Sequence, residues 1–96
     1  MKKGENLHRR YCISGKVQGV GFRQFTQQTA QKLNIAGWVR NLPDGRVETE
    51  AEGDAVQLEA FEKALREGPP LGRVDGVGVN ESTVKGNLPT PFEVRR

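Results

Sequence analysis

The residues best suited to chemistry lie in one short glycine-containing segment, Lys16 to Arg23. Gly19 and Gly21 allow a positive φ and a close approach of the backbone to another group. A sequence with helical spacing follows, and the first N–H groups of a helix lack partners inside it. Arg23 adds a planar fork of donors. The segment therefore predicts an anion site, with phosphate as the preferred occupant. The alternative is a tight strand-to-helix turn with a solvated arginine.

The expected phosphate ligands are chiefly the backbone N–H groups of this segment. It remains open whether the side chains of Lys16 and Gln18 also contact the anion. The predicted phosphate-binding residues are Lys16, Val17, Gln18, Gly19, Val20, Gly21, Phe22 and Arg23.

Asn41 is the second candidate for chemistry. It lies at the end of an expected strand, just before the turn Leu42-Pro43-Asp44-Gly45. A carboxamide can accept from a water molecule and donate to a developing charge. We expect the strand after the first helix to lie beside the first strand, which brings Asn41 near the anion-binding segment. The alternative is an Asx-type residue that holds the turn.

Other reactive side chains are scarce. Cys12 is the single cysteine and His8 the single histidine, so neither an internal disulfide nor a zinc cluster is expected. We interpret Cys12 as a small, partly buried side chain. With no catalytic triad and no metal cluster, any catalysis would rest on positioning and electrostatics, which suits phosphoryl chemistry without metal or cofactor.

Hydrophobic periodicity predicts the elements that position these residues. The order of strands and helices indicates an α+β fold of the split β-α-β type, with an antiparallel sheet of four to five strands and two helices on one face. The expected strands are 7–15, 35–42, 46–53, 73–81 and 92–95, and the expected helices are 22–33 and 55–67.

Several local signals refine these elements. Asn34 suits a left-handed cap after the first helix, and Asp54 with Gln57 forms a capping box before the second. Gly76 indicates a bulge. In the third strand, we expect alternate residues to face the core and the intervening acids to face water. Those acids are Glu48, Glu50 and Glu52.

Length and charge limit the functional classes. The 96 residues predict one domain over 1–96 with a flexible start at 1–6. A net charge of +3 favours anionic ligands but is too small to argue for nucleic acid. No apolar run suits a membrane span or a signal peptide. We expect a monomer in the cytoplasm.

Two motifs together resemble the acylphosphatase family. The segment 13–23, Ile-Ser-Gly-Lys-Val-Gln-Gly-Val-Gly-Phe-Arg, is similar to the first motif of that family, and 37–47, followed by Gly53, is similar to the second. The resemblance extends from about Arg9 to Val94. It implies a ferredoxin-like sandwich and metal-independent hydrolysis of the carboxyl–phosphate bond of acyl phosphates. Inorganic phosphate would be the product and an inhibitor.

The resemblance also implies residue roles. The loop amides and Arg23 would bind the phosphate, and Asn41 would orient the attacking water. Two alternatives are a nucleic-acid-binding module and a non-catalytic accessory domain of the same fold. Against the first, Tyr11 and Trp38 do not lie in an aromatic, basic run, and Trp38 is better interpreted as core or pocket wall.

Overall fold

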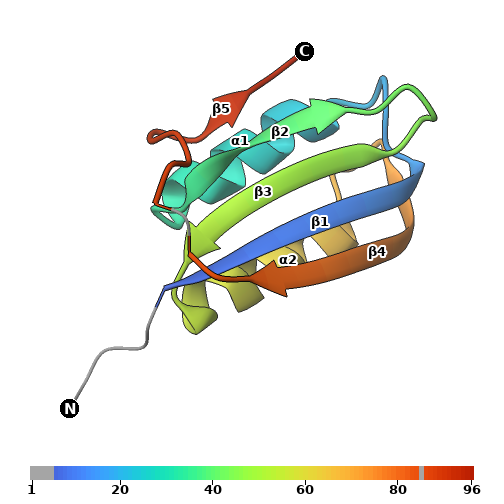
Figure 1. Ribbon diagram of the computed structural model, residues 1–96. Helices are drawn as coiled ribbons and strands as arrows, with labels where there is room; N and C mark the ends of the chain where they lie inside the picture. Colours follow the sequence, from blue (N-terminus) through green and yellow to red (C-terminus); the bar gives the residue numbers. More distant parts are fainter. Residues whose placement is uncertain (1–5, 85) are drawn as a thin grey trace.

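The computed structural model describes residues 6–84 and 86–96, so nearly all of the expected flexible start lies outside the described residues. Two helices cover one face of a five-stranded sheet (Figure 1). This is the ferredoxin-like α+β fold that the sequence predicted. The elements are β1 (Leu7–Lys16), α1 (Phe22–Lys32), β2 (Ala36–Asn41), β3 (Val47–Gly53), α2 (Ala55–Glu67), β4 (Arg73–Ser82) and β5 (Glu93–Val94).

The strand order corrects two expectations. The order is β4-β1-β3-β2-β5, so β3 lies between β1 and β2, and β2 does not lie beside β1. The connection through α1 leaves a gap one strand wide, and the hairpin after β2 returns β3 into that gap, antiparallel to both neighbours. The sheet is also mixed, because β5 pairs with β2 in parallel. The expected sheet was antiparallel throughout.

The core lies between the sheet and the helices. The inward face of α1 buries Phe22, Thr26 and Ala30. Helical spacing predicts that Phe25 belongs to the same apolar stripe, but its side chain is only half-buried. Complete burial of a large apolar side chain contributes about 1.5–3 kcal/mol. The other main core residues are Tyr11, Ile13, Val39, Val47, Ala51, Leu58, Phe61, Leu65 and Phe92. Within the described ranges, no helix is long and apolar enough to cross a membrane.

The local signals of the sequence are confirmed. Asn34 has a φ of 58° immediately after the end of α1. The Asp54 side chain accepts from the Gln57 N–H, and the Gln57 side chain accepts from the Asp54 N–H, both at 2.8 Å. Next to Gly76, β4 carries one extra residue opposite Ser14 and Gly15 of β1. Cys12 is half-buried, as expected.

The prediction for the acids of β3 was wrong. Glu48 is 4% exposed and Glu52 is 9% exposed, although they lie on the face without helices. Arg10 and Arg40 both donate to Glu48. His8 lies 3.0 Å from Glu52 and 2.7 Å from Glu50.

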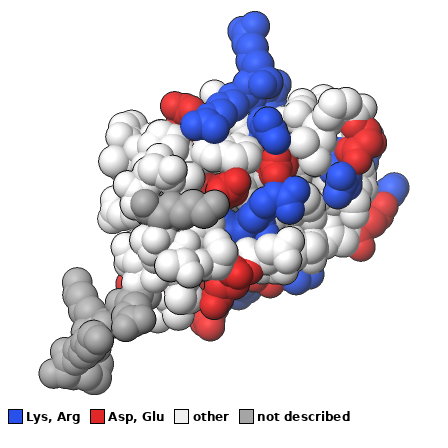
Figure 2. All heavy atoms as spheres, in the orientation of Figure 1, with Lys and Arg blue, Asp and Glu red and all other residues white. Residues whose placement is uncertain are grey.

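The cause is the central position of β3 in the sheet, because long side chains from both neighbouring strands cover its acids. Figure 2 shows basic and acidic side chains intermixed on this face. Within residues 6–84 and 86–96, no group of His, Cys, Asp and Glu is arranged to hold a metal ion.

Candidate active site

A glycine loop joins β1 to α1. Gly19 has a φ of 75° and Gly21 a φ of 78°, and a Cβ at either position would meet no atom within 4 Å. The glycines are therefore needed for backbone conformation and not for lack of space. Gly21 is also the residue that precedes α1, and no side chain caps this helix start. The first-turn N–H groups thus point out of the helix without a side-chain acceptor.

Arg23 lies in the first turn of α1 and is half-buried. Its Nη1 donates to the backbone oxygen of Arg95 at 3.1 Å, just after β5. Gln27, one turn further along the helix, donates to the Phe92 oxygen at 3.3 Å. These bonds connect α1 to the C-terminal strand and hold the Arg23 side chain over the end of β2.

Asn41 is the last residue of β2, opposite Val47 of β3. Its side chain makes no hydrogen bond to another described residue, whereas Asp44 accepts from the Arg46 N–H at 3.1 Å. The Asx-type role in this turn therefore belongs to Asp44. The carboxamide of Asn41 is left available to a ligand or a water molecule.

Gln18 connects the glycine loop to the hairpin that follows Asn41. Its Nε2 donates to the backbone oxygens of Leu42 at 2.8 Å and Arg46 at 3.0 Å. The side chain thus faces the hairpin, and it is absent from the lining of the neighbouring cleft. Sequence reasoning missed this role, because the partners are backbone groups in another part of the chain.

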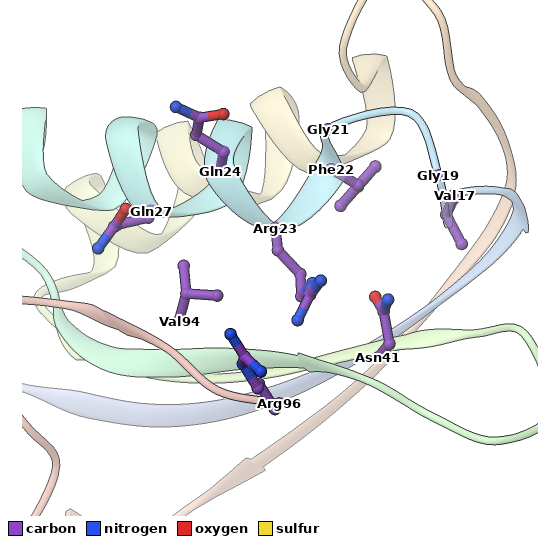
Figure 3. A pocket seen from close by; sticks show the side chains of 10 residues that line it. All are labelled: Val17, Gly19, Gly21, Phe22, Arg23, Gln24, Gln27, Asn41, Val94 and Arg96. Carbon is purple, nitrogen blue, oxygen red and sulfur yellow. The ribbon is translucent and has the colours of Figure 1, made fainter.

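The loop, Arg23 and Asn41 meet at one cleft of about 520 Å³. Figure 3 shows the side chains of Arg23 from α1, Asn41 from the end of β2 and Arg96 from the segment after β5 at the same space. The lining residues are Val17, Gly19, Gly21, Phe22, Arg23, Gln24, Gln27, Asn41, Val94 and Arg96.

Three predicted residues do not line this cleft. Lys16 is exposed at the end of β1 opposite Arg73, and Val20 packs against the core. Gln18 faces the hairpin, as described above.

Four lining residues were missed by the sequence reasoning. The sequence predicts a solvated, glutamine-rich face for this helix, which includes Gln24 and Gln27. Gln27 lies four residues after Arg23, a spacing that places both on one side of the helix, and this was the available signal. Gln24, the immediate neighbour of Arg23, offered no such signal. Val94 and Arg96 carried no local signal, because only the pairing of β5 with β2 brings them here.

The electrostatics of the cleft favour an anion. Of the described residues, two arginines, Arg23 and Arg96, line the cleft, and none of its lining residues is an aspartate or glutamate. The helix start adds partial positive charge at the same end. A tetrahedral anion can therefore be bound by amides and guanidinium groups without repulsion from an acidic side chain of the described residues.

Comparisons with known proteins agree with this geometry. The family model Acylphosphatase matches residues 9–94. The chain is 49% identical to the acylphosphatase of Rubrobacter xylanophilus over 86 residues, which cover 90% of this chain and 77% of the relative. The crystal structure of an acylphosphatase from Bacillus subtilis is 42% identical and superposes with a TM-score of 0.88, covering 94% of this chain and 99% of that one.

A larger protein contains a similar unit. The structure of full-length HypF in its phosphate- and nucleotide-bound form is 33% identical and superposes with a TM-score of 0.84. The match covers 99% of this chain but only 12% of HypF.

Proposed function

The chain belongs to the acylphosphatase family, hydrolases of the carboxyl–phosphate bond of acyl phosphates, and we propose how its own residues perform that reaction. The amides of the loop 16–22 and the guanidinium of Arg23 hold the phosphate. Asn41 orients the water that attacks phosphorus. The products are a carboxylate and inorganic phosphate, which also inhibits by occupying the same amides.

The phosphate site depends on backbone donors. Gly19 and Gly21 have left-handed conformations just before α1, and a turn of this kind would direct loop N–H groups toward an anion at the start of the helix. Arg23 contributes a charge-assisted fork, held in place by its bond to the Arg95 oxygen. Charge that spreads over the equatorial oxygens of the phosphoryl group during transfer meets donors that are already oriented.

Asn41 supplies the polar group for the nucleophile. Its carboxamide oxygen accepts from the attacking water, while its N–H₂ can donate to a phosphoryl oxygen. The carboxylate that leaves is stable, so the reaction needs little general acid catalysis. This agrees with the cleft lining, which includes no histidine, aspartate or glutamate from the described parts of the chain.

One observation carries the proposal: the glycine loop, Arg23 and Asn41, whose side chain has no hydrogen-bond partner among the described residues, converge on one cleft that no acidic side chain of those residues lines. We also propose that residues 1–96 form one domain, that the protein is a monomer and that it acts in the cytoplasm. In this proposal the enzyme uses no cofactor or metal and binds no nucleic acid. Trp38 supports the last point. It is 7% exposed, and the guanidinium groups of Arg40 and Arg95 lie 5.3 and 4.9 Å from its ring centroid, so little of the ring is open for stacking on a base.

Hydrolysis of acetyl phosphate and benzoyl phosphate by the purified chain tests the proposal. We expect turnover that is unchanged by EDTA and competitively inhibited by inorganic phosphate. Absence of turnover, or loss in EDTA that a divalent ion restores, would contradict it.

A further inference from the structure

The glycine loop has a packed side as well as an open side. A Cβ at Gly19 or Gly21 would meet no atom within 4 Å, whereas Val20 between them is partly buried and packs against the core. Val20 points toward the connection between α2 and β4. This connection is residues 68–72, Gly-Pro-Pro-Leu-Gly, called the proline segment below.

The proline segment lies close to three points of the loop. A Cβ added at Gly72 would lie 3.2 Å from the backbone oxygen of Lys16 and 3.3 Å from Cγ2 of Val20. A Cβ added at Gly68 would lie 3.6 Å from Cε2 of Phe22, the first residue of α1. The start, the middle and the end of the loop 16–22 are therefore all backed by this one segment.

The segment is itself held in place. Pro69 is buried, and its backbone oxygen accepts from the Gly72 N–H at 3.0 Å, which closes a turn. The next residue, Arg73, pairs with Lys16 at the end of the β1–β4 ladder. The segment thus forms a fixed support on the side of the loop away from the cleft.

We propose that the proline segment sets the shape of the phosphate loop, and that Gly72 is a positioning residue for the loop amides. The inference rests on the proposed function, because it takes those amides as the phosphate ligands. Residues 68–72 are not among the residues that line the cleft. They act through Val20 and the Lys16 backbone and do not touch the substrate.

This support differs from the one that Gln18 provides. The hydrogen bonds of Gln18 hold the loop against the hairpin after Asn41, so they set the distance between the phosphate and the water. The proline segment sets how the loop amides converge. Donors stabilise an anion most when they are oriented before it arrives, so this second support should control phosphate affinity itself.

Gly72→Ala is the main perturbation. Gly72 does not have a positive φ, so alanine brings no backbone strain at this position. Its Cβ is too close to Lys16 and Val20, which must give way by a few tenths of an ångström. A shift of that size should weaken phosphate binding about threefold to tenfold, less than the roughly hundredfold effect of a displacement of about 1 Å.

Three further variants make the test specific. Gly78→Ala is the matched control, because Gly78 of β4 also lacks a positive φ and its Cβ would meet its nearest atom, the Cys12 oxygen, only at 3.9 Å. Val20→Ala opens the contact from the side of the loop. The double variant Gly72→Ala/Val20→Ala completes a double-mutant cycle. Circular dichroism and thermal unfolding establish that each variant is folded at the assay temperature.

The dissociation constant of inorganic phosphate is measured from the amide NMR shifts of residues 16–22, beside kcat and KM for benzoyl phosphate. We expect wild type and Gly78→Ala to agree. Gly72→Ala should raise the dissociation constant and KM by the same factor, with a smaller change in kcat, because the loop holds the phosphoryl group before and during the reaction. This factor should shrink in the Val20→Ala background, where one of the two close contacts is gone.

An unchanged phosphate dissociation constant in folded Gly72→Ala overturns the inference, even if Tm falls, because the segment then only stabilises the fold. An equal effect in Gly78→Ala, or an undiminished effect in the Val20→Ala background, overturns it as well. If Gly72→Ala does not fold, Val20→Ala decides alone: it should also weaken phosphate binding, and an unchanged dissociation constant contradicts the role of this contact.

The wild type separates this failure from failure of the proposed function. If phosphate binds at residues 16–22 and neither variant changes its affinity, only the role of the proline segment is wrong. If phosphate does not bind at these amides, both proposals fall.

Discussion

Replacing Gln18 by alanine should impair catalysis without removing any group that touches the substrate. The Gln18 side chain joins the glycine loop to the backbone oxygens of Leu42 and Arg46, which flank the turn after Asn41. Its loss leaves the proposed phosphate amides and the Asn41 carboxamide intact. The substitution removes only the hydrogen bonds that hold the glycine loop against the hairpin after Asn41.

The expected loss of stability in Gln18→Ala depends on the other hydrogen bonds that the Leu42 and Arg46 oxygens accept. The Leu42 oxygen still accepts from the Gly45 N–H at 3.2 Å, and the Arg46 oxygen from the Leu42 N–H at 2.8 Å. Neither backbone oxygen is left without a donor in the variant. The free energy of unfolding should therefore fall by about 1–2 kcal/mol for the two lost hydrogen bonds together. In a domain of this size, that lowers Tm by roughly 5–15 °C. A displacement of Asn41 of about 1 Å would lower kcat up to a hundredfold, with a smaller change in KM.

Steady-state hydrolysis of benzoyl phosphate and thermal unfolding test this expectation. Gln28→Ala is the matched control, because Gln28 is exposed on α1 and makes no hydrogen bond through its side chain to a described residue. Gln18→Glu should be more damaging than alanine, since a carboxylate cannot donate to the two oxygens. If folded Gln18→Ala keeps its kcat while both KM and the inhibition constant for phosphate rise, the side chain contacts the anion and the reasoning is refuted.

Four other results are expected. Arg23→Ala should raise KM and the phosphate inhibition constant and also lower kcat, with poor rescue by lysine. Asn41→Ala should lower kcat about a hundredfold with phosphate inhibition nearly unchanged, and near-normal kcat in a folded variant would remove Asn41 from the mechanism. Amide NMR shifts on phosphate titration should cluster at residues 16–22, and a cluster elsewhere would disprove the phosphate site. Burial raises the pKa of Glu48, but hydrogen bonds from Arg10 and Arg40 outweigh this and bring it below its usual 4.5. Glu48 therefore stabilises the fold above that pH and loses this effect as the pH falls. Glu48→Gln should lower the free energy of unfolding, measured in urea, by about 1–3 kcal/mol at pH 7 and by less at pH 3. An equal decrease at both pH values would refute the link between Glu48 ionisation and stability.

Local features of this protein were determined by its sequence. The strands, the helices and the capping box of Asp54 follow from residue periodicity and from hydrogen bonds within a few residues. The glycine loop is local too, because Gly19 and Gly21 adopt a positive φ more readily than other residues. The family motifs lie in these same local segments. The assignment of Arg23 and Asn41 to one site also came from the motifs.

Features that depend on partners distant in the chain were decided by the tertiary structure. The alternation in β3 correctly predicted which face Glu48 occupies, but burial came from arginines on the two neighbouring strands. The insertion of β3 between β1 and β2 is a property of the whole sheet, as is the parallel pairing of β5. Gln18 and Arg96 illustrate the same limit at the site. A periodic pattern specifies the face on which a side chain lies, whereas its neighbours are specified only when strands and loops pack together.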